Sequence, residues 1–321
     1  MVEYIDILRN IIISFMITLI LGPILIPMLK KLKIGQSVRD DGPQSHLKKS
    51  GTPTMGGLII FIALVITILT SGMFNRDMLV LLLSTFGFGL IGFIDDYIKV
   101  VKRRSLGLRA YQKLIGQVLL ATMLAIYQLS TSVLGTKLII PFLSNQYLDL
   151  GILYVPFIAF VVVGTVNSVN LTDGLDGLAS GVTLIVLSFF ALVALNLGMV
   201  SISIFSTTLA GACLGFLIHN VYPAKIFMGD TGSMALGGAV SAIAILLNLP
   251  LLIPIVGGIY FIEALSVIIQ VISFKTTGKR VFLMSPLHHH FEQKGWKEIK
   301  VVAVFWTVTV ILSLIGLISL S

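Results

Sequence analysis

The chain has 321 residues, of which 56% are hydrophobic and only 11% are charged, with a formal net charge of +8. Soluble domains contain roughly 25% charged residues, so this composition excludes a soluble globular enzyme, a disordered chain and a nucleic-acid-binding domain. It is typical of a protein that lies within a lipid bilayer. The single cysteine, Cys213, cannot form an intramolecular disulfide.

Apolar stretches of about 17–25 residues predict membrane-spanning helices. Ten such stretches follow one another, with no long linker and no fixed-period repeat, so residues 1–321 are expected to form a single all-α polytopic membrane domain. The third, fifth, seventh and eighth are short enough to be half-buried core helices instead. The ten stretches are 11–29, 56–74, 78–94, 114–134, 150–166, 178–199, 202–218, 233–249, 251–274 and 301–320.

Basic residues gather on one side of these spans. Only Arg9, Arg76 and Lys137 of the 22 lysines and arginines lie on the other side. The positive-inside rule therefore places the basic segments in the cytoplasm and both termini outside, which agrees with an even number of spans. The five basic-side segments are 30–53, 95–113, 167–177, 219–232 and 275–300.

The same five segments hold most of the side chains that can do chemistry. They contain nine of the 14 acidic residues and all five histidines. Carboxylates beside strong basic charge suit an anionic substrate that is held with a divalent cation. The acidic residues are Asp40, Asp41, Asp95, Asp96, Asp173, Asp176, Asp230, Glu292 and Glu298.

Two adjacent carboxylates, Asp95 and Asp96, stand at the inner end of the third span and are followed by Lys99. If the helix continues, Lys99 lies one turn from both of them. Adjacent carboxylates repel each other unless a metal ion or a lysine offsets the charge. The pattern indicates a functional acidic pair or, as the alternative, a solvated helix end with an ion pair.

A polar run, NSVNLTDGLDG, occupies residues 167–177 between two apolar spans. Asp173 and Asp176 are three residues apart, and the glycines permit tight turns. Uncompensated carboxylates are costly near lipid, which favours a functional role. The alternative is that one of the two aspartates caps the following helix.

A third run, FMGDTGS at residues 227–233, follows Asn220 and Lys225 and precedes an apolar span. Asp230 could bind a metal ion, and the loop could offer free backbone N–H groups to a phosphate. The alternative is that Asp230 is only an N-cap.

Three consecutive histidines, His288, His289 and His290, lie in a basic segment. Three neighbours cannot easily ligate one ion and no cysteine is near, so contact with a phosphate or sugar is preferred, with zinc as the alternative.

The run GPQSHLKKSGTPTMGG at residues 42–57 combines glycines, hydroxyl groups and lysines, and it predicts a structured loop that contacts an anion. Neither a GxxxxGK[ST] nor a GxGxxG motif is present, so ATP coupling and dinucleotide chemistry have no support.

These motifs, in this order and over nearly the whole chain, resemble those of the polyprenyl-phosphate N-acetylhexosamine-1-phosphate transferases. Relatives that use UDP-GlcNAc share the aspartate motifs. The triple-histidine loop followed by FEQKGW, together with the GTPTMGG loop, is similar to the muramoyl-pentapeptide branch of the family.

The resemblance implies an Mg²⁺-dependent enzyme of the bacterial plasma membrane with its active site facing the cytoplasm. It would transfer phospho-N-acetylmuramoyl-pentapeptide from UDP-MurNAc-pentapeptide to undecaprenyl phosphate, giving lipid I and UMP in the first membrane step of peptidoglycan synthesis. A homodimer is also implied, although no periodicity specifies it. The alternatives are a UDP-GlcNAc:polyprenyl-phosphate GlcNAc-1-phosphate transferase and, from another class, a membrane transporter.

By motif match, the resemblance implies catalytic roles for Asp95, Asp96, Asp230 and His288. Asp230 would be the Mg²⁺ ligand, and Asp95 would orient or deprotonate the lipid phosphate. The implied substrate-binding residues are Lys49, Thr54, Lys99, Lys113, Asn167, Asn170, Asp173, Asp176, Asn220, His289 and His290.

Glu263 is nearly the only charged residue deep within a predicted span. It could be a helix-packing group that faces a polar cavity, or it could form part of a lipid groove. A transporter would repeat polar residues along a path at mid-membrane, so this scarcity favours a surface enzyme.

Overall fold

The structure is a computed structural model that describes residues 2–32, 49, 51–100, 102, 107–143 and 146–320. Residues 42–48 and 50 of the expected anion loop, His46 among them, lie outside the described residues. Asp40 and Asp41 also lie outside them, whereas every residue that was given a catalytic or substrate-binding role above lies within them.

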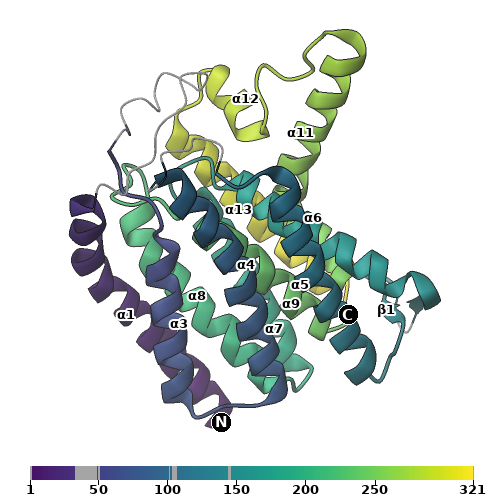
Figure 1. Cartoon of the computed structure of the whole chain (residues 1–321). Coiled ribbons are helices and arrows are strands. Elements are labelled where there is room, and N and C mark those ends of the chain that lie inside the picture. Colours follow the sequence, from purple (N-terminus) through teal and green to yellow (C-terminus); the bar gives the residue numbers. More distant parts are fainter. Residues whose placement is uncertain are drawn as a thin grey trace.

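The described chain is mostly helical (Figure 1). Its elements in chain order are α1 (Val2–Lys31), α3 (Gly57–Ser71), α4 (Arg76–Val100), α5 (Ala110–Thr131), β1 (Lys137–Ile139), β2 (Tyr147–Asp149), η1 (Gly151–Leu153), α6 (Tyr154–Thr172), α7 (Leu178–Asn196), α8 (Val200–Asn220), α9 (Gly229–Leu246), η2 (Pro250–Leu252), α10 (Ile253–Val256), α11 (Gly258–Thr277), α12 (Leu287–Gln293) and α13 (Glu298–Ile318).

Nine of the described helices are long and apolar enough to cross a membrane, and α3 is a shorter apolar helix of 15 residues. Each of the ten predicted stretches overlaps one of these helices. The prediction that the third stretch is short is wrong, because α4 has 25 residues and continues past Asp95 and Asp96 to Val100. The last turns of α4 therefore carry polar side chains that lie beyond the end of the predicted apolar stretch.

Helices α8 and α9, which correspond to the seventh and eighth stretches, form the centre of the bundle. Within their apolar windows 83% and 89% of the residues are buried, compared with 22% for α1. Helix α9 packs mainly against α4 and α6, and α8 packs mainly against α1 and α7. Both are also long and apolar enough to cross a membrane, so these two stretches form candidate spans that other helices cover on most sides.

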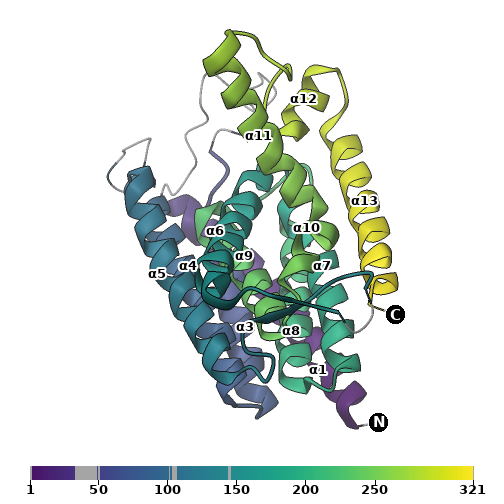
Figure 2. The same ribbon diagram turned by 90° about the vertical axis from the view of Figure 1, so that its right-hand side faces the viewer.

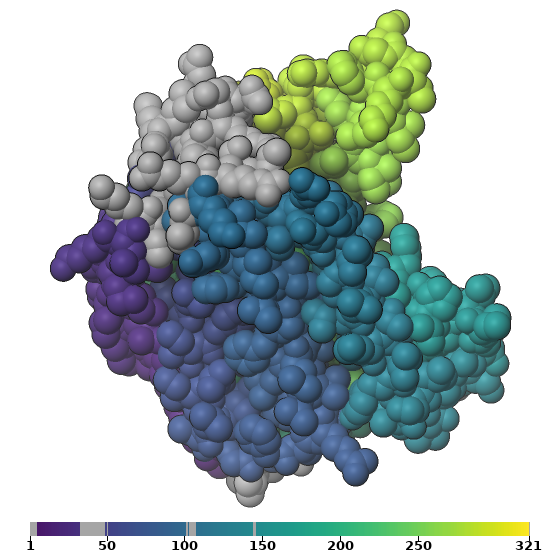
Figure 3. Space-filling model, viewed as in Figure 1, coloured from purple at the N-terminus to yellow at the C-terminus, as the bar shows by residue number. Residues whose placement is uncertain are grey.

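The ninth predicted stretch is interrupted. It begins as η2 and α10, breaks at Gly257, and continues as α11. Pro250, Pro254 and the glycine pair that starts at Gly257 explain the break, because proline lacks an N–H donor and glycine favours helix ends. The C-terminal end of α11 stands clear of the bundle in Figures 1 and 3.

The prediction of an all-α chain is wrong at one hairpin. β1 and β2 pair antiparallel, with Leu138 opposite Leu148. The hairpin is anchored to the bundle, since Ile139 N donates to the carbonyl oxygen of Asn248 at 3.3 Å. The first residue of α1 and the last turn of α13 lie toward the end of the molecule that is opposite α12 (Figure 2).

Candidate active site

Four contacts join the five basic-side segments at one end of the bundle. Lys49 Nζ lies 2.7 Å from Asp176 Oδ1 and 2.6 Å from Glu298 Oε1. The other oxygen of Asp176 accepts a hydrogen bond from Ala224 N at 2.9 Å. Residues 95–113 join through Lys113 Nζ, which lies 2.9 Å from Asp230 Oδ2. The expectation that the five segments share one face is confirmed.

The centre of this face is a group that we call the carboxylate–lysine cluster: Asp95, Asp96, Asp230, Lys99 and Lys113. Lys99 Nζ lies 2.6 Å from Asp95 Oδ2 and 3.0 Å from Asp230 Oδ2. Lys113 Nζ contacts the same two oxygens at 2.8 and 2.9 Å. Two ammonium groups therefore bridge two carboxylates that would otherwise repel each other. The predicted one-turn contact between Lys99 and Asp95 is confirmed.

Asp96 holds the beginning of α9. Its carboxylate accepts hydrogen bonds from Asp230 N at 3.2 Å, from Thr231 N at 2.9 Å and from Thr231 Oγ1 at 2.6 Å. These two backbone N–H groups are therefore already bonded and are not available to a phosphate, which limits the expectation that this loop offers free N–H groups. The simple N-cap alternative for Asp230 is wrong, because Met228 is the N-cap residue and has no side-chain cap bond.

Asn170 continues the cluster toward α6. Its Nδ2 donates to Asp230 Oδ1 at 3.0 Å and to Ser233 Oγ at 2.8 Å. Asp173 follows α6 directly and is partly buried. The pKa of Asp173 is raised well above its usual range, first by burial and then by nearby carboxylates, among which Asp230 has the largest effect. Burial and the neighbouring carboxylates thus favour the protonated form of Asp173.

A second ion-paired group lies beside the cluster, and we call Lys49, Asp176 and Glu298 the clasp. Glu298 Oε1 accepts from both Lys49 Nζ and Asp176 N, the latter at 2.7 Å. Asp176 does not cap α7, because the N-cap residue is Gly177 and has no side-chain cap bond. Asn220 supports the same turn, since its Oδ1 accepts from Gly177 N at 3.1 Å. The buried side chain of Asn220 therefore helps to hold the turn beside the clasp in place.

The described part of the first basic-side segment packs against the start of α9. Gly56 N donates to Phe227 O at 2.9 Å, and Phe227 N donates to Pro53 O at 2.8 Å. Thr54 is buried there. A Cβ atom added to Gly229 would lie 2.7 Å from both Thr54 Oγ1 and Asp96 Oδ2, and the φ of Gly229 is +74°. Only glycine fits this turn, which brings Thr54 next to the cluster.

The three histidines have three different surroundings. His288 is buried, with Nδ1 3.1 Å from Glu263 Oε2. His289 Nδ1 lies 2.8 Å from Glu292 Oε2. His290 Nδ1 accepts from Leu283 N at 3.1 Å, and burial lowers the pKa of His290, which favours the neutral ring that this bond requires. Within the described chain the three rings do not converge on one ion, so the zinc alternative has no support here.

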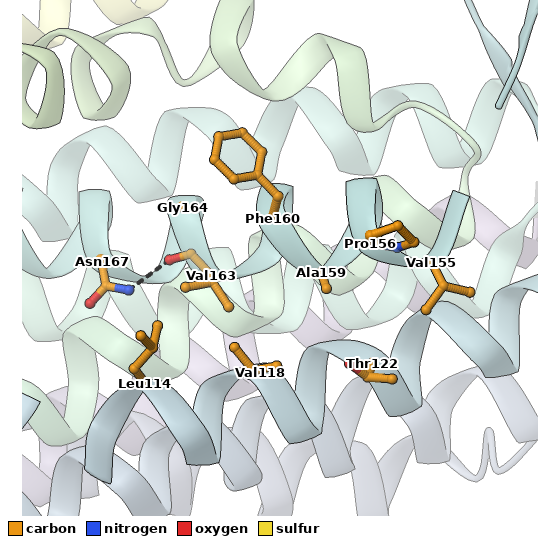
Figure 4. Close-up of a pocket in the computed structure, with 10 residues that line it drawn as sticks. All are labelled: Leu114, Val118, Thr122, Val155, Pro156, Ala159, Phe160, Val163, Gly164 and Asn167. Carbon is orange, nitrogen blue, oxygen red and sulfur yellow. Dashed lines mark hydrogen bonds between the residues drawn. The ribbon is translucent and has the colours of Figure 1, made fainter. Parts of the chain in front are cut away.

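An apolar groove of about 610 Å³ runs between α5 and α6 (Figure 4). Asn167 lies at one end of it, three residues before Asn170. Its Nδ2 donates to Val163 O at 2.8 Å and to Gln117 Oε1 at 2.7 Å. The groove is lined by Leu114, Val118, Thr122, Val155, Pro156, Ala159, Phe160, Val163, Gly164 and Asn167.

The cluster fits a divalent metal ion. One carboxylate oxygen from each of Asp95, Asp96 and Asp230 lies within 4.8 Å of the others, and no other such group occurs in the residues that the structure describes. Such hard oxygen donors suit Mg²⁺ and similar ions. When ionised, these three carboxylates carry three negative charges against two positive charges on the bridging lysines, so the cluster has a net negative charge that a cation would offset.

Comparison with known proteins identifies the family. Residues 78–248 match the family model described as glycosyl transferase family 4, and residues 49–61 match the signature described as phospho-N-acetylmuramoyl-pentapeptide-transferase signature 1. The chain belongs to glycosyl transferase family 4. The first match contains the whole carboxylate–lysine cluster, and the second begins at Lys49 of the clasp.

Relatives named phospho-N-acetylmuramoyl-pentapeptide-transferase match nearly the full chain. The protein of Alkaliphilus oremlandii (strain OhILAs) is 63% identical over 99% of this chain and 99% of its own length. That of Alkaliphilus metalliredigens (strain QYMF) is 61% identical over the whole of both chains. That of Clostridium botulinum (strain Alaska E43 / Type E3) is 58% identical over 98% of this chain and 96% of its own length.

Some residues of this family member's site were not identified from the sequence. Thr231 holds Asp96, Ser233 holds Asn170, and Glu298 completes the clasp. Glu298 had one signal, because it is an acidic residue at the start of an apolar span in a chain with few acidic residues. The hydroxyl groups of Thr231 and Ser233 had none, since such groups are common at helix starts.

Proposed function

We propose that this protein transfers phospho-N-acetylmuramoyl-pentapeptide from UDP-MurNAc-pentapeptide to undecaprenyl phosphate, giving lipid I and UMP. The observation that carries this proposal is the carboxylate–lysine cluster at one end of a bundle of apolar helices. One substrate is a soluble polyanion and the other is a lipid phosphate at the membrane surface. A site with both lysines and metal-binding carboxylates at helix ends suits that pair of substrates.

The site then faces the cytoplasm, where the nucleotide substrate is made. The excess of lysine and arginine in the five segments supports this orientation. With α3 as a short tenth span, the first and last residues of the chain lie on the outer side. The homodimer that the resemblance implies remains a prediction.

The reaction joins a phosphate oxygen of undecaprenyl phosphate to the phosphorus that carries the sugar. The bond from that phosphorus to the bridging oxygen breaks, and the oxygen leaves with UMP. Both reactants are anions, so their approach is repulsive. Lys99 and Lys113 offset part of this charge, and Mg²⁺ bound by Asp230 with Asp95 or Asp96 would neutralise more.

Asp95 acts mainly by position. The second pKa of a phosphomonoester is about 6, so most of the attacking phosphate has already lost its proton at pH 7. Asp95 Oδ1 accepts from Leu108 N at 2.7 Å, which fixes the orientation of its carboxylate. A fixed carboxylate that holds Lys99 and Lys113 in place can order the reacting phosphates without taking a proton.

The groove between α5 and α6 receives the polyprenyl chain. Its apolar lining suits isoprene units, and Asn167 at its end leads through Asn170 to Asp230. The clasp and the turn at Asp173 bind the nucleotide part, and His288, whose ring lies against Gly174 of this turn, contacts the sugar together with His289 and His290.

The test uses purified protein in detergent with UDP-MurNAc-pentapeptide and Mg²⁺. We expect UMP release only when undecaprenyl phosphate is added, and a product that contains both lipid and sugar. Comparable release from UDP-GlcNAc would favour the related GlcNAc-1-phosphate transferase. If protein that shows a thermal unfolding transition, and is therefore folded, releases UMP from neither nucleotide sugar, the proposal is contradicted.

A further inference from the structure

Glu263 is a fully buried carboxylate within α11, and the roles proposed above do not use it. It lies beside α12, which packs against α11 (Figures 1 and 2). An acidic side chain at such depth is costly unless it has partners, and it is a candidate for function by default. The question is which group it serves.

Both oxygens of Glu263 face the same residue. His288 N donates to Glu263 Oε1 at 3.2 Å, and His288 Nδ1 lies 3.1 Å from Glu263 Oε2. One oxygen thus holds the backbone at the start of α12 and the other faces the imidazole ring. His288 is itself fully buried, so this arrangement fixes the ring as well as the loop.

The opposite edge of the ring points at the turn that follows α6. A Cβ atom added to Gly174 would lie only 2.2 Å from His288 Nε2. This nitrogen is buried and has no hydrogen-bond partner in the structure. His288 Nδ1 and Glu263 Oε2 form no aligned hydrogen bond either, so their separation of 3.1 Å is a close electrostatic contact. Gly174 is adjacent to Asp173, so an unpartnered nitrogen is aimed at the segment that also carries Asn170 and Asp176.

A neutral imidazole carries its proton on one nitrogen, and the partner of the other nitrogen decides which one. A lone pair on Nδ1 would be repelled by the Glu263 carboxylate 3.1 Å away, so the proton is favoured on Nδ1, and Nε2 is left with a free lone pair. We propose that Glu263 is a positioning residue that fixes the Nδ1–H tautomer of His288, so that Nε2 accepts a hydrogen bond from a hydroxyl or amide donor of the nucleotide sugar. This role rests on the proposed transferase function.

The isosteric change Glu263→Gln tests the tautomer. The amide oxygen can still accept from His288 N, but the NH₂ group would then face Nδ1 and donate to it. The proton of the ring would move to Nε2, which would become a donor. We expect the turnover rate to fall about 10–100-fold, as for other residues that orient a functional histidine, with a smaller change in KM for the nucleotide sugar. Ser266→Ala is the matched control, because Ser266 is buried one turn away on α11 and its hydroxyl donates to the backbone carbonyl of Glu263, not to the carboxylate or to His288.

The direct readout is ¹⁵N NMR of the full-length protein with labelled histidine, in detergent at pH 8, with His288→Gln to assign the signal. We expect the proton of His288 on Nδ1 in the wild type and in Ser266→Ala, and on Nε2 in Glu263→Gln. A wild-type ring that carries a proton on Nε2, alone or on both nitrogens, would overturn the inference even if Glu263→Gln does not fold. Because this readout needs no turnover, it separates failure of the inference from failure of the proposed function.

Discussion

Lys113 Nζ lies 2.9 Å from Asp230 Oδ2, although 117 residues separate them in the chain. The same ammonium group lies 2.8 Å from Asp95 Oδ2. Lys113 therefore joins α5 to the end of α4 and to the start of α9, at the place where the phosphates would react. This position makes it more than a basic residue of an anchoring loop.

We predict that Lys113→Met lowers the rate of UMP release by about 10–100-fold, because it removes a positive charge that would face the developing charge in the transition state. The measurement is the steady-state rate with both substrates at saturation. Lys137→Met is the control, because Lys137 is exposed in β1 at the other end of the bundle. Equal rates for the two variants would contradict the role given to Lys113.

Glu298→Gln should weaken binding of the nucleotide sugar. Glu298 holds both Lys49 Nζ and Asp176 N, so the change loosens both remaining members of the clasp. KM for UDP-MurNAc-pentapeptide should rise, with KM for the lipid phosphate unchanged, and the free energy of unfolding should fall by about 1–3 kcal/mol.

The double variant Lys49→Met with Glu298→Gln provides the control for the clasp. Each single change already breaks the contact between Lys49 and Glu298, so the stability loss of the double variant should be smaller than the sum of the two single losses. Additive losses, or a KM effect confined to the lipid substrate, would argue against the clasp.

Asp173→Asn should raise the thermal stability of the protein in EDTA while it lowers the rate of transfer. The pKa of Asp173 is raised in the folded state, so its contribution to stability is complete only below the unfolded pKa of about 3.9 and is lost as pH rises through the folded value. The Tm of Asp173→Asn minus that of the wild type should therefore grow as pH rises from 5 to 8.5. A difference that stays constant or shrinks would show that Asp173 is not destabilised by its charge.

The groove between α5 and α6 can be tested with Ala159→Trp, which fills part of its lining. We expect KM for undecaprenyl phosphate to rise about tenfold, while KM for the nucleotide sugar stays unchanged, because only the lipid chain loses apolar contact. Leu83→Trp serves as the control, since Leu83 is exposed on α4 outside the groove. If both variants behave like the wild type, the polyprenyl chain does not lie in this groove.

Much of this arrangement was predictable from the sequence because it depends on local spacing or on charge asymmetry. The one-turn relation of Lys99 to Asp95 follows from helix geometry, and the common face of the five segments follows from the distribution of lysine and arginine. Both features can therefore be predicted without knowledge of how the helices pack.

Other features arise only from packing. Lys49 and Glu298 meet across 249 residues, and Glu263 meets His288 across 25, so no local period reports either contact. Hydropathy does not reveal the break at Gly257, because the residues on both sides of it are apolar and together resemble one span. Two N–H groups near Asp230 donate hydrogen bonds to Asp96, which lies on another helix, so the local sequence could not show that they are occupied.

The most direct test of the central claim, that the carboxylate–lysine cluster is the catalytic centre, is a Mg²⁺ titration of UMP release by the wild type and Asp230→Asn. Asparagine keeps the shape of the side chain but removes the charge that a hard cation requires. The variant should lose activity by about 100-fold or more at every Mg²⁺ concentration, with a thermal transition that shows folded protein. A near-normal rate with an unchanged Mg²⁺ titration would contradict the account.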